Sequence, residues 1–386
     1  MATRTLNCSL ERGLESKFKE KNLLPILKQY GRGAFSYATL QDGMDYFIDE
    51  DMGYISYVKE KHPIFAPRGK SIVLGEPISS EEDKPKILRK FLEKNPQSIF
   101  IPVSEYFGHT LQEEGFKVNC VGHEPILRVD EYNTKGNWKE LDSIKRARNE
   151  VKRNNIRIEE VSMNEISRKS LEQISDNWLK GKVLNDREIW IYARRPVFED
   201  EEDVRKFVAF DKEDSPIGFV FYDPIYEDGV ITGYSANISR CNEERYKKLS
   251  VAVNMNAIEK FREGKAKELN LCISPFDKVE QGSLNDDGMT QLFFMMCREF
   301  GEDIYNFKGL SFYKSKYRGE ERPIYFASNS LMPVNDVYLA FRSSSIANGY
   351  TQTLMSLAKG IGSQKADAKK VFDRWKFLRK SKKEQS

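Results

Sequence analysis

The densest run of residues able to bind phosphate lies in a basic segment near the middle of the chain. From Lys145 to Arg157, thirteen residues include six lysines and arginines and one acid, Glu150. Lys145, Arg148 and Lys152 recur at helical spacing and would form one stripe of a helix. Such a stripe can follow the phosphates of a nucleic acid. The alternative is a helix face that contacts only water.

Cysteine and histidine chemistry finds little support in the sequence. The five cysteines are widely spaced without a C-x-x-C pair, and the three histidines form no H-x-x-x-H motif. These spacings argue against a disulfide framework and against a zinc site. A G-x-S-x-G nucleophile elbow is missing as well. The sequence therefore predicts reduced thiols in the cytoplasm, no metal site and no serine–histidine nucleophile.

Length and composition predict two folded domains. The chain has 386 residues, of which 39% are hydrophobic and 12% aromatic, enough for substantial cores. No apolar run approaches the roughly 20 residues that a membrane-spanning helix needs, and the first 21 residues lack the apolar region of a secretory signal. The formal charge, 62 − 59 = +3, says little about partners. We expect a soluble protein, at most peripheral to the inner face of a membrane.

Glycine and proline positions divide the chain into two similar halves. The first half is expected to run strand 71–74, helix 86–93, strand 98–104, helix 106–114 and strand 116–121. The second is expected to run strands 219–222 and 230–236, helix 249–263, strand 269–273 and helix 288–298. This order predicts an α/β (α+β) unit used twice. We place the N-terminal domain at 1–135, a basic connecting helix at 136–158, the C-terminal domain at 159–345 and a basic helical tail at 346–386.

The helical tail is basic and amphipathic. Between Lys365 and Lys383 there are nine lysines and arginines and two aspartates. Ala368, Val371, Phe372, Trp375 and Leu378 share one helical face. A helix of this kind can lie on an anionic membrane or contact RNA. Alternatively, its apolar face packs on the body of the protein and leaves the lysines in water.

Several stretches, in this order and spacing, resemble one known family. They are Gly75-Glu-Pro77, Glu114-Gly-Phe116, Val121-Gly-His-Glu-Pro125, the basic helix, Asp176-Asn-Trp-Leu179, Asn237-Ile-Ser-Arg240, Asn270-Leu-Cys-Ile-Ser-Pro275 and Tyr305-Asn-Phe-Lys-Gly-Leu-Ser-Phe-Tyr-Lys-Ser-Lys-Tyr317. The resemblance is to the C-terminal catalytic domain of phosphatidylglycerol lysyltransferase, of the multiple peptide resistance factor type. It covers about residues 35–328, and its last stretch is the most specific.

The resemblance implies two acetyltransferase-like (GNAT) domains in tandem, in agreement with the duplication. It also implies an aminoacyltransferase that takes its amino acid from a charged tRNA, with no cofactor besides this co-substrate. The acceptor would be a lipid similar to phosphatidylglycerol, or a small hydroxyl or amine compound. In this view Lys145, Arg148 and Lys152 bind the tRNA, and the tail offers a contact to an anionic membrane surface.

The family's D-x-x-R pair, which surrounds the bound aminoacyl group, falls on Asn237 and Arg240. Asparagine can hydrogen-bond an ammonium but cannot form the ion pair that aspartate forms. We therefore expect Asn237 to help to select the amino acid. Arg240 and Lys316 are the predicted catalytic cations, because an activated ester needs alignment and oxyanion stabilisation above all. If residues 313–317 form a strand, Lys314 points away from the side that Lys316 faces.

Three further residues are candidates for substrate binding, each with a structural alternative. Glu124 follows a predicted strand and would bind the ammonium or act as a base, unless it only forms a salt bridge. Trp178 would stack on the terminal adenine of tRNA, unless it packs in a core or domain interface. Ser274 closes a predicted strand before a proline and would line the substrate tunnel.

Two other classes of function stay open. An acyl-CoA-dependent N-acyltransferase of this fold would present a glycine-rich turn to the pyrophosphate, whereas residues 240–246 contain no glycine and two acids. A non-catalytic RNA- or membrane-binding protein could retain the same double fold, and it would tolerate the loss of Arg240 and Lys316 together.

Overall fold

The computed structural model describes residues 4–6, 18–134, 141–180, 188–242, 245–246, 248–347 and 350–385. Within these residues fourteen strands form one mixed sheet, whose main order is β1-β2-β3-β4-β6-β14-β7-β12-β11-β10-β9-β8. The strands are β1 Arg4–Leu6, β2 Asp45–Asp49, β3 Gly53–His62, β4 Ala66–Leu74, β5 Ile78–Ser79, β6 Ser98–Val103, β7 Lys117–Arg128, β8 Arg157–Glu160, β9 Arg205–Phe210, β10 Pro216–Glu227, β11 Val230–Cys241, β12 Glu268–Asn270, β13 Ser274–Pro275 and β14 Glu320–Ser328.

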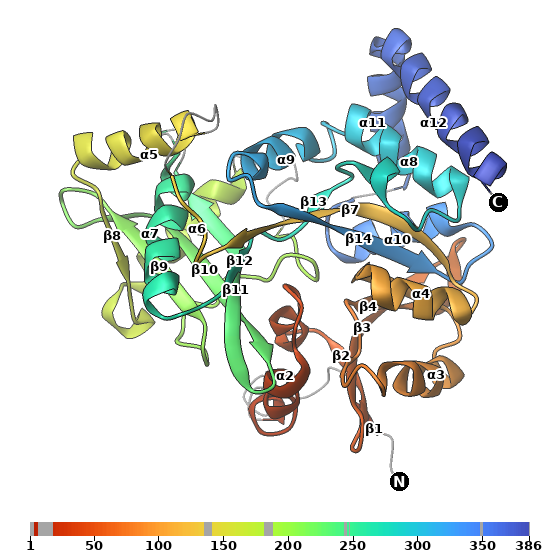
Figure 1. The fold of residues 1–386 in the computed structure, drawn as a ribbon, viewed down its shortest axis with the longest axis horizontal. Helices are drawn as coiled ribbons and strands as arrows, with labels where there is room; N and C mark the ends of the chain where they lie inside the picture. The colour runs from red at the N-terminus through yellow and green to blue at the C-terminus, as the bar shows by residue number, and fades with distance from the viewer. Residues whose placement is uncertain are drawn as a thin grey trace.

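Helices cover this sheet, and the last two helices project beyond it (Figure 1). They are α2 Leu24–Tyr30, α3 Lys84–Lys94, α4 Glu105–Glu113, α5 Leu141–Arg153, α6 Arg168–Lys180, α7 Leu249–Glu263, α8 Gly288–Phe300, α9 Phe307–Ser315, α10 Pro333–Ser343, α11 Tyr350–Ser363 and α12 Lys365–Gln385. Within the part of the chain that the structure describes, none of them combines the length and the apolar character that a bilayer crossing requires.

The sheet is built from one arrangement used twice. Strands β2, β3 and β4 form an antiparallel meander, and α3 then leads to β6, which runs parallel to β4. Strands β9, β10 and β11 form a second meander, and α7 leads to β12, which runs parallel to β11. The predicted duplication of an α/β unit is confirmed. In each repeat one pair of strands is parallel, β4 with β6 and β11 with β12, and the pairing stops before β6 and β11 end.

The two halves are joined because their last strands are exchanged. Strand β7 ends the first repeat but pairs with β12 of the second, whereas β14 comes from the second half and lies between β6 and β7. Figure 1 shows these long strands side by side across the middle of the molecule. Since β7 and β14 belong to both parts of the sheet, the predicted domain boundaries at residues 135, 158 and 345 stay predictions.

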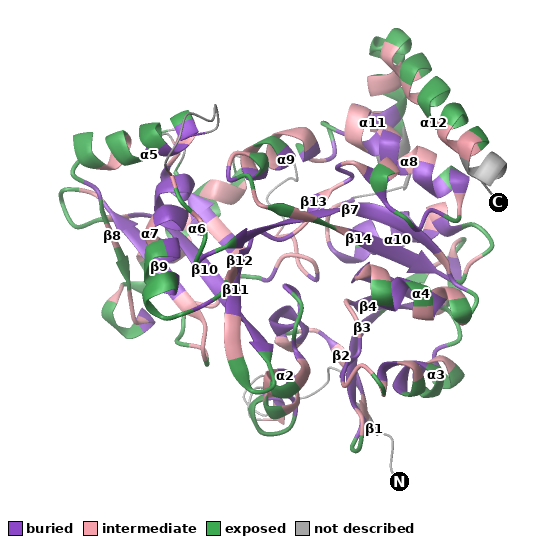
Figure 2. Cartoon of the chain, in the orientation of Figure 1, coloured by how far each residue is buried: buried purple, intermediate pink, exposed green. Residues whose placement is uncertain are grey.

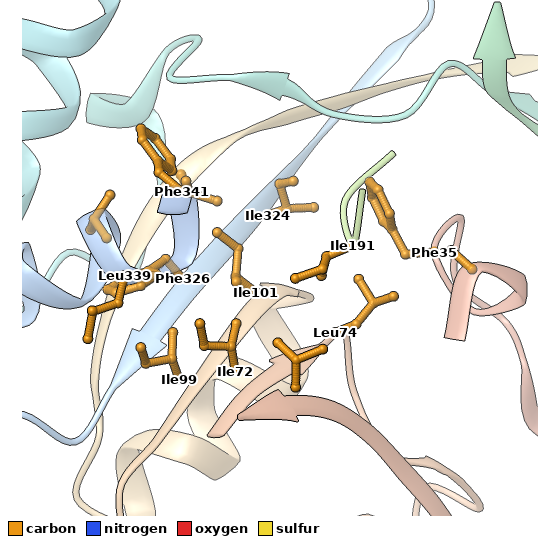
Figure 3. Packing of buried hydrophobic residues seen from close by; sticks show 14 of the residues in the cluster. Phe35, Ile72, Leu74, Ile99, Ile101, Ile191, Ile324, Phe326, Leu339 and Phe341 are labelled. Carbon is orange, nitrogen blue, oxygen red and sulfur yellow. The ribbon is translucent and has the colours of Figure 1, made fainter. Parts of the chain in front are cut away.

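A large apolar core lies where β4, β6 and β14 face α10 (Figure 3). Ile72, Ile99 and Phe326 are fully buried there, and Leu339 of α10 packs against the same cluster. Burying one such side chain contributes roughly 1.5–3 kcal/mol to folding. Ile191 also belongs to this core and brings the segment after α6 against the first half.

The basic helix α5 is amphipathic as predicted. Leu141, Ile144 and Ala147 are buried against the second half, and the cations of the helix face outward (Figure 2). Residues 139 and 140 of the predicted helix lie outside the described residues. One expected strand is shorter than residues 269–273, because Cys272 adopts a left-handed φ of 58° and ends the ladder after Asn270.

The C-terminal helix α12 packs on the body of the protein. The indole Nε1 of Trp375 donates to the carbonyl oxygen of Gly288 at 2.9 Å, and Arg374 pairs with Glu280. Ala368, Val371 and Leu378 pack against the core on the same face, so Trp375 is withdrawn from the face that could meet a membrane. Phe377 lies on the outer face, where 71% of its surface is exposed.

Candidate functional site

A cavity of about 230 Å³ lies beyond Ser235 and Asn270, the last residues at which β11 and β12 pair. Its walls come from β11, from the segment after β12, from α6 and α9, and from residues 188–193. The charged residues among those that line it are Arg240, Lys314 and Glu188. The predicted residues Arg240, Asn237 and Trp178 all line this one cavity, whereas Lys316 does not.

Arg240 is held between a ring and a carboxylate. Its guanidinium carbon lies 3.8 Å from the centroid of the Trp178 ring, and Nη2 forms an ion pair with Glu188. Nη1 donates to the carbonyl oxygen of Ser239 at 3.1 Å. Burial lowers the pKa of Arg240, and the charge of Glu188 opposes this effect. These contacts fix the guanidinium and turn it toward the cavity.

Two buried polar atoms at the cavity have no hydrogen-bond partner among the described residues: Arg240 Nε and the hydroxyl of Tyr192. Buried polar groups are nearly always hydrogen-bonded, so such orphans require an explanation. Burial raises the pKa of Tyr192, which keeps its hydroxyl neutral. Both atoms are themselves buried, so the two unsatisfied groups lie in the wall of the cavity rather than on its open surface.

Asn237 has both ends of its amide engaged. Its Nδ2 donates to Asp223 Oδ2 at 2.8 Å, and its Oδ1 accepts from the backbone N–H of Arg194 at 3.2 Å. Asp223 is fully buried and ion-pairs with Arg194 at 2.7 Å. Burial raises the pKa of Asp223, and Arg194 opposes that rise. An acid therefore lies beneath Asn237, but another side chain already neutralises it.

Lys314 reaches the cavity from helix α9, which begins after Asn306, whose Oδ1 accepts from the Gly309 N–H at 2.8 Å. The segment 313–317 thus consists of the end of α9 followed by a turn at Lys316 and Tyr317, and a strand is wrong for it. Phe307, Leu310 and Lys314 lie three and four residues apart on the helix face that lines the cavity.

The ammonium of Lys314 is held by backbone carbonyls. Its Nζ donates to Cys272 O at 3.0 Å and to Ile273 O at 2.6 Å, and burial lowers the pKa of Lys314 to about 8. Cys272 presents its carbonyl because of the left-handed backbone that ends β12, a conformation that stores strain in a residue other than glycine. Strain of this kind is often retained at functional sites.

Glu124 lies behind the same segment and lines a second cavity of about 410 Å³. Its Oε2 accepts from Asn270 Nδ2 at 3.1 Å, and Asn270 Oδ1 accepts from the Cys272 N–H at 2.7 Å. Burial raises the pKa of Glu124, against the opposing charges of Arg322 and Lys314. This cavity lies at the ends of β4 and β6, the position in the first half that corresponds to the Arg240 cavity in the second.

A basic groove of about 1010 Å³ runs along α5, α7 and α9. Five cations line it, with Glu150 as the one acid of its lining: Arg146, Lys152, Arg153, Lys248 and Lys316. Tyr313 lines both this groove and the Arg240 cavity. The predicted catalytic Lys316 therefore belongs to the groove.

The remaining predicted residues lie apart from the cavity. Lys145 and Arg148 are exposed on α5 outside the groove, whereas Lys152 lines it. Ser274 is buried in β13 opposite His123, and its neighbours Ile273 and Pro275 line the cavity instead. Residues 243, 244 and 247, near the glycine-free turn, lie outside the described residues.

Sequence reasoning missed Glu188, Tyr192 and the role of Lys314. Lys314 had a usable signal, because Asn306 is a typical N-cap residue and predicts a helix that would place Lys314 on the face of Phe307 and Leu310. Glu188 and Tyr192 lie in an irregular segment without periodicity, which offered no such signal. Among the described residues, no three acidic, histidine or cysteine side chains gather to hold a metal ion.

Comparison with known proteins gives one family match. Residues 25–328 match the family described as phosphatidylglycerol lysyltransferase, C-terminal. An uncharacterized protein of Corynebacterium glutamicum is 22% identical over 332 residues, which is 83% of this chain and 40% of that protein. The chain thus spans well under half the length of this curated relative.

Two solved structures share the fold. The structure of L-PGS from Bacillus licheniformis superposes with a TM-score of 0.65 at 19% identity, over 88% of this chain and 99% of that one. The C-terminal domain of a proposed lysylphosphatidylglycerol synthetase from Agrobacterium fabrum gives 0.66 at 18% identity, over 86% and 97%. At these identities the likeness shows the fold, and it confirms the predicted mixed α/β architecture.

Proposed function

The chain belongs to the phosphatidylglycerol lysyltransferase C-terminal family, and on this premise we propose that it transfers an aminoacyl group from a charged tRNA to an acceptor. The acceptor is a lipid similar to phosphatidylglycerol, or a small hydroxyl or amine compound. The observation that carries the proposal is that Tyr313 lines two different spaces, a basic groove and a largely apolar cavity that holds Arg240 and Lys314.

The groove suits the end of a tRNA. Arg146, Lys152 and Lys316 face a space open to solvent, where they can contact backbone phosphates. Lys145 and Arg148, exposed on the same helix, extend the basic surface to phosphates farther from the groove. Beyond Tyr313, the ester of the terminal ribose would enter the cavity, and Trp178 would form its wall rather than stack freely on a base.

The reaction needs positioning and charge stabilisation. The acceptor oxygen or nitrogen forms a bond to the ester carbonyl carbon, the bond to the ribose oxygen breaks, and the proton of the acceptor passes to that ribose oxygen. Arg240, in the wall of the cavity, would hold the aminoacyl carbonyl region, and the Lys314 ammonium would stabilise the oxyanion of the tetrahedral intermediate. Lys314 thus takes the role that the sequence suggested for Lys316, which serves the tRNA.

The acceptor would enter from the second cavity. Arg322 and Glu124 line it, and an acceptor that carries both a phosphate and a hydroxyl could place the phosphate at Arg322 and the hydroxyl near Glu124. Glu124, whose pKa burial raises, would hold the polar head of the acceptor by a hydrogen bond, while the reacting oxygen or nitrogen reaches the ester near Lys314. The segment from Asn270 to Ile273 separates Glu124 from Lys314 and contacts both.

Access to a membrane would depend on the outer face of α12. Lys369, Lys376 and Lys380 are exposed there beside Phe377, a combination that favours anionic lipid surfaces. A lipid acceptor is reached most directly by an enzyme that binds the surface of the bilayer. We therefore place the protein in the cytoplasm, peripheral to the inner face of the membrane.

The decisive experiment offers the purified protein a mixture of radiolabelled aminoacyl-tRNAs together with anionic vesicles and a small-molecule extract. Label that moves to a lipid or a small compound supports the proposal. Label that stays on tRNA, with acetyl transfer from acetyl-CoA instead, would establish the acyl-CoA alternative. Binding of tRNA without any transfer would establish a non-catalytic protein.

A further inference from the structure

We propose that the Arg240 cavity accepts an aminoacyl group with an uncharged, apolar side chain and excludes those of lysine and arginine. This inference rests on the proposed transfer from charged tRNA and specifies which charged tRNA is used. Four observations carry it: the charges in the cavity, the state of Asn237, the buried ions beneath it and the apolar walls.

Among the described residues of the lining, positive charges outnumber negative ones. Arg240 and Lys314 are the cations of the lining, and Glu188 is the one acid among the described residues there. Glu188 forms an ion pair with Arg240, so Lys314 leaves one positive charge in excess. A second ammonium in this space would meet repulsion instead of an ion-pair partner.

Asn237 offers little compensation for a cationic side chain. Its carbonyl oxygen, the atom that could accept from an ammonium, already accepts from the backbone of Arg194. Its Nδ2 is occupied by Asp223. The second lone pair of this oxygen could offer an incoming ammonium one neutral hydrogen bond, which is weaker than the ion pair that an aspartate would form.

The ions beneath Asn237 are balanced among themselves. Arg194 pairs with both Asp223 and Glu201, and Lys206 pairs with Glu201 at 2.8 Å, which makes two cations and two anions. All four are largely buried, and Asp223 is not exposed at all. Arg194 therefore balances most of the negative charge of Asp223, which still acts on Cys272 at the cavity wall.

The walls of the cavity are apolar and aromatic. Leu179, Ile189, Val220, Ile273, Phe307 and Leu310 contribute aliphatic and aromatic surface to it. An uncharged side chain gains from contact with such walls, whereas a charged one loses its hydration without a partner. The α-ammonium is common to all aminoacyl esters, so a contact with Glu188, shared with Arg240, would not discriminate between them and would leave no acid of the described lining for a side-chain ammonium.

Binding of tRNAs with a stable 3′-amide in place of the ester tests the inference without knowledge of the acceptor. One tRNA body would carry leucine, phenylalanine, glutamate, lysine or nothing, and dissociation constants would be measured for the full-length protein. We expect leucine or phenylalanine to bind on the order of 100-fold more tightly than lysine, because an unpaired buried charge is so unfavourable. Lysine should bind no better than the uncharged tRNA, and glutamate should bind more weakly than leucine, because the apolar walls remove its hydration.

A pair of substitutions at one wall position supplies the matched control. Ile189 lines the cavity and is half-buried. Ile189→Glu would add the acid that the cavity lacks, and Ile189→Gln has nearly the same shape without the charge. We expect the glutamate variant to bind the lysine-bearing tRNA about 10-fold more tightly than the glutamine variant does.

The outcomes separate the inference from the proposed function. If the lysine-bearing or glutamate-bearing tRNA binds best to the wild type, the inference is overturned, while the preference for a charged tRNA still supports the function. If no aminoacyl group improves binding over the uncharged tRNA, the cavity does not recognise an aminoacyl group and both fall.

Discussion

The guanidinium of Arg240 stacks on the indole of Trp178, with 3.8 Å between the guanidinium carbon and the ring centroid. Glu188 pairs with the same guanidinium, so a ring and a carboxylate hold it while its Nε has no partner among the described residues. The residue that the sequence suggested as a base-stacking platform thus positions a cation. Stacking of this kind contributes roughly 0.5–2 kcal/mol.

Loss of the Arg240 guanidinium should slow aminoacyl transfer strongly and leave tRNA binding in the groove unchanged. For Arg240→Ala we expect single-turnover transfer to slow on the order of 10²–10³-fold, the usual effect of removing a charge-stabilising donor. Trp178→Leu should slow it about 10-fold, because the guanidinium is retained but less well positioned. Filter binding of tRNA should change little in either variant. Near-normal transfer by Arg240→Ala would contradict this site.

The two lysines of α9 should have separable effects. Lys314→Met removes the ammonium at the cavity, so we expect slower transfer at saturating tRNA. Lys316→Met removes a cation of the groove, so we expect weaker tRNA binding with a nearly unchanged maximal rate. Rates measured over a range of tRNA concentrations distinguish the two. The reverse pattern would restore Lys316 to the catalytic role that the sequence suggested.

Lys314 should also give stability and activity opposite dependences on pH. Its pKa is about 8 in the folded protein against 10.5 ordinarily. Below pH 8 both states carry the proton, and between 8 and 10.5 the unfolded state binds more protons, so stability rises with pH by up to about 3 kcal/mol. Transfer needs the charged form and should fall over the same range.

Lys314→Met is the control, since its unfolding free energy should lack this alkaline rise. Denaturant unfolding at pH 7, 8, 9 and 10 compares the two proteins, and transfer is measured in single turnovers corrected for hydrolysis of the ester. A difference between the proteins that does not change with pH would show that Lys314 titrates normally.

More of the fold than of the site could be predicted from the sequence. Local patterns were sufficient for α3, α5 and α7, because amphipathic spacing and the glycine after residue 263 define them without tertiary information. The exchange of β7 and β14 could not be predicted, because it depends on pairing between strands some 200 residues apart. Residues of the site could be predicted only where they lie together on a single helix or strand. Glu188 meets Arg240 across 52 residues, from a segment with no regular structure of its own.

Reversal of charge on α5 should separate the groove from the rest of the helix. In one double variant Arg146 and Lys152, which line the groove, become glutamate; in the matched variant Lys145 and Arg148, which are exposed outside it, become glutamate. Both change the charge by the same amount. We expect the groove variant to weaken tRNA binding more and to reduce the salt slope by about two, as for two lost phosphate contacts.

Equal effects of the two double variants would indicate a diffuse electrostatic surface rather than a defined groove. If neither variant affects tRNA binding, the tRNA docks elsewhere and α5 is only a solvated helix, the alternative that its sequence left open. Transfer from a saturating tRNA concentration should survive in both, because neither pair lines the Arg240 cavity.

The outer face of α12 should govern binding to membranes without affecting the chemistry. Deletion of the helix is a poor test, because Trp375 and its neighbours pack on α8 and the core. The substitutions Lys376→Glu and Phe377→Ser change only exposed residues. Each basic residue near an anionic surface contributes about 1 kcal/mol, so we expect this double variant to bind anionic vesicles at least 10-fold more weakly in sedimentation assays.

The thermal midpoint of the double variant should stay at the wild-type value, whereas Trp375→Ala should lower the midpoint. Transfer to a water-soluble acceptor should be unchanged in the double variant; unchanged vesicle binding would show that α12 serves only to cover α8.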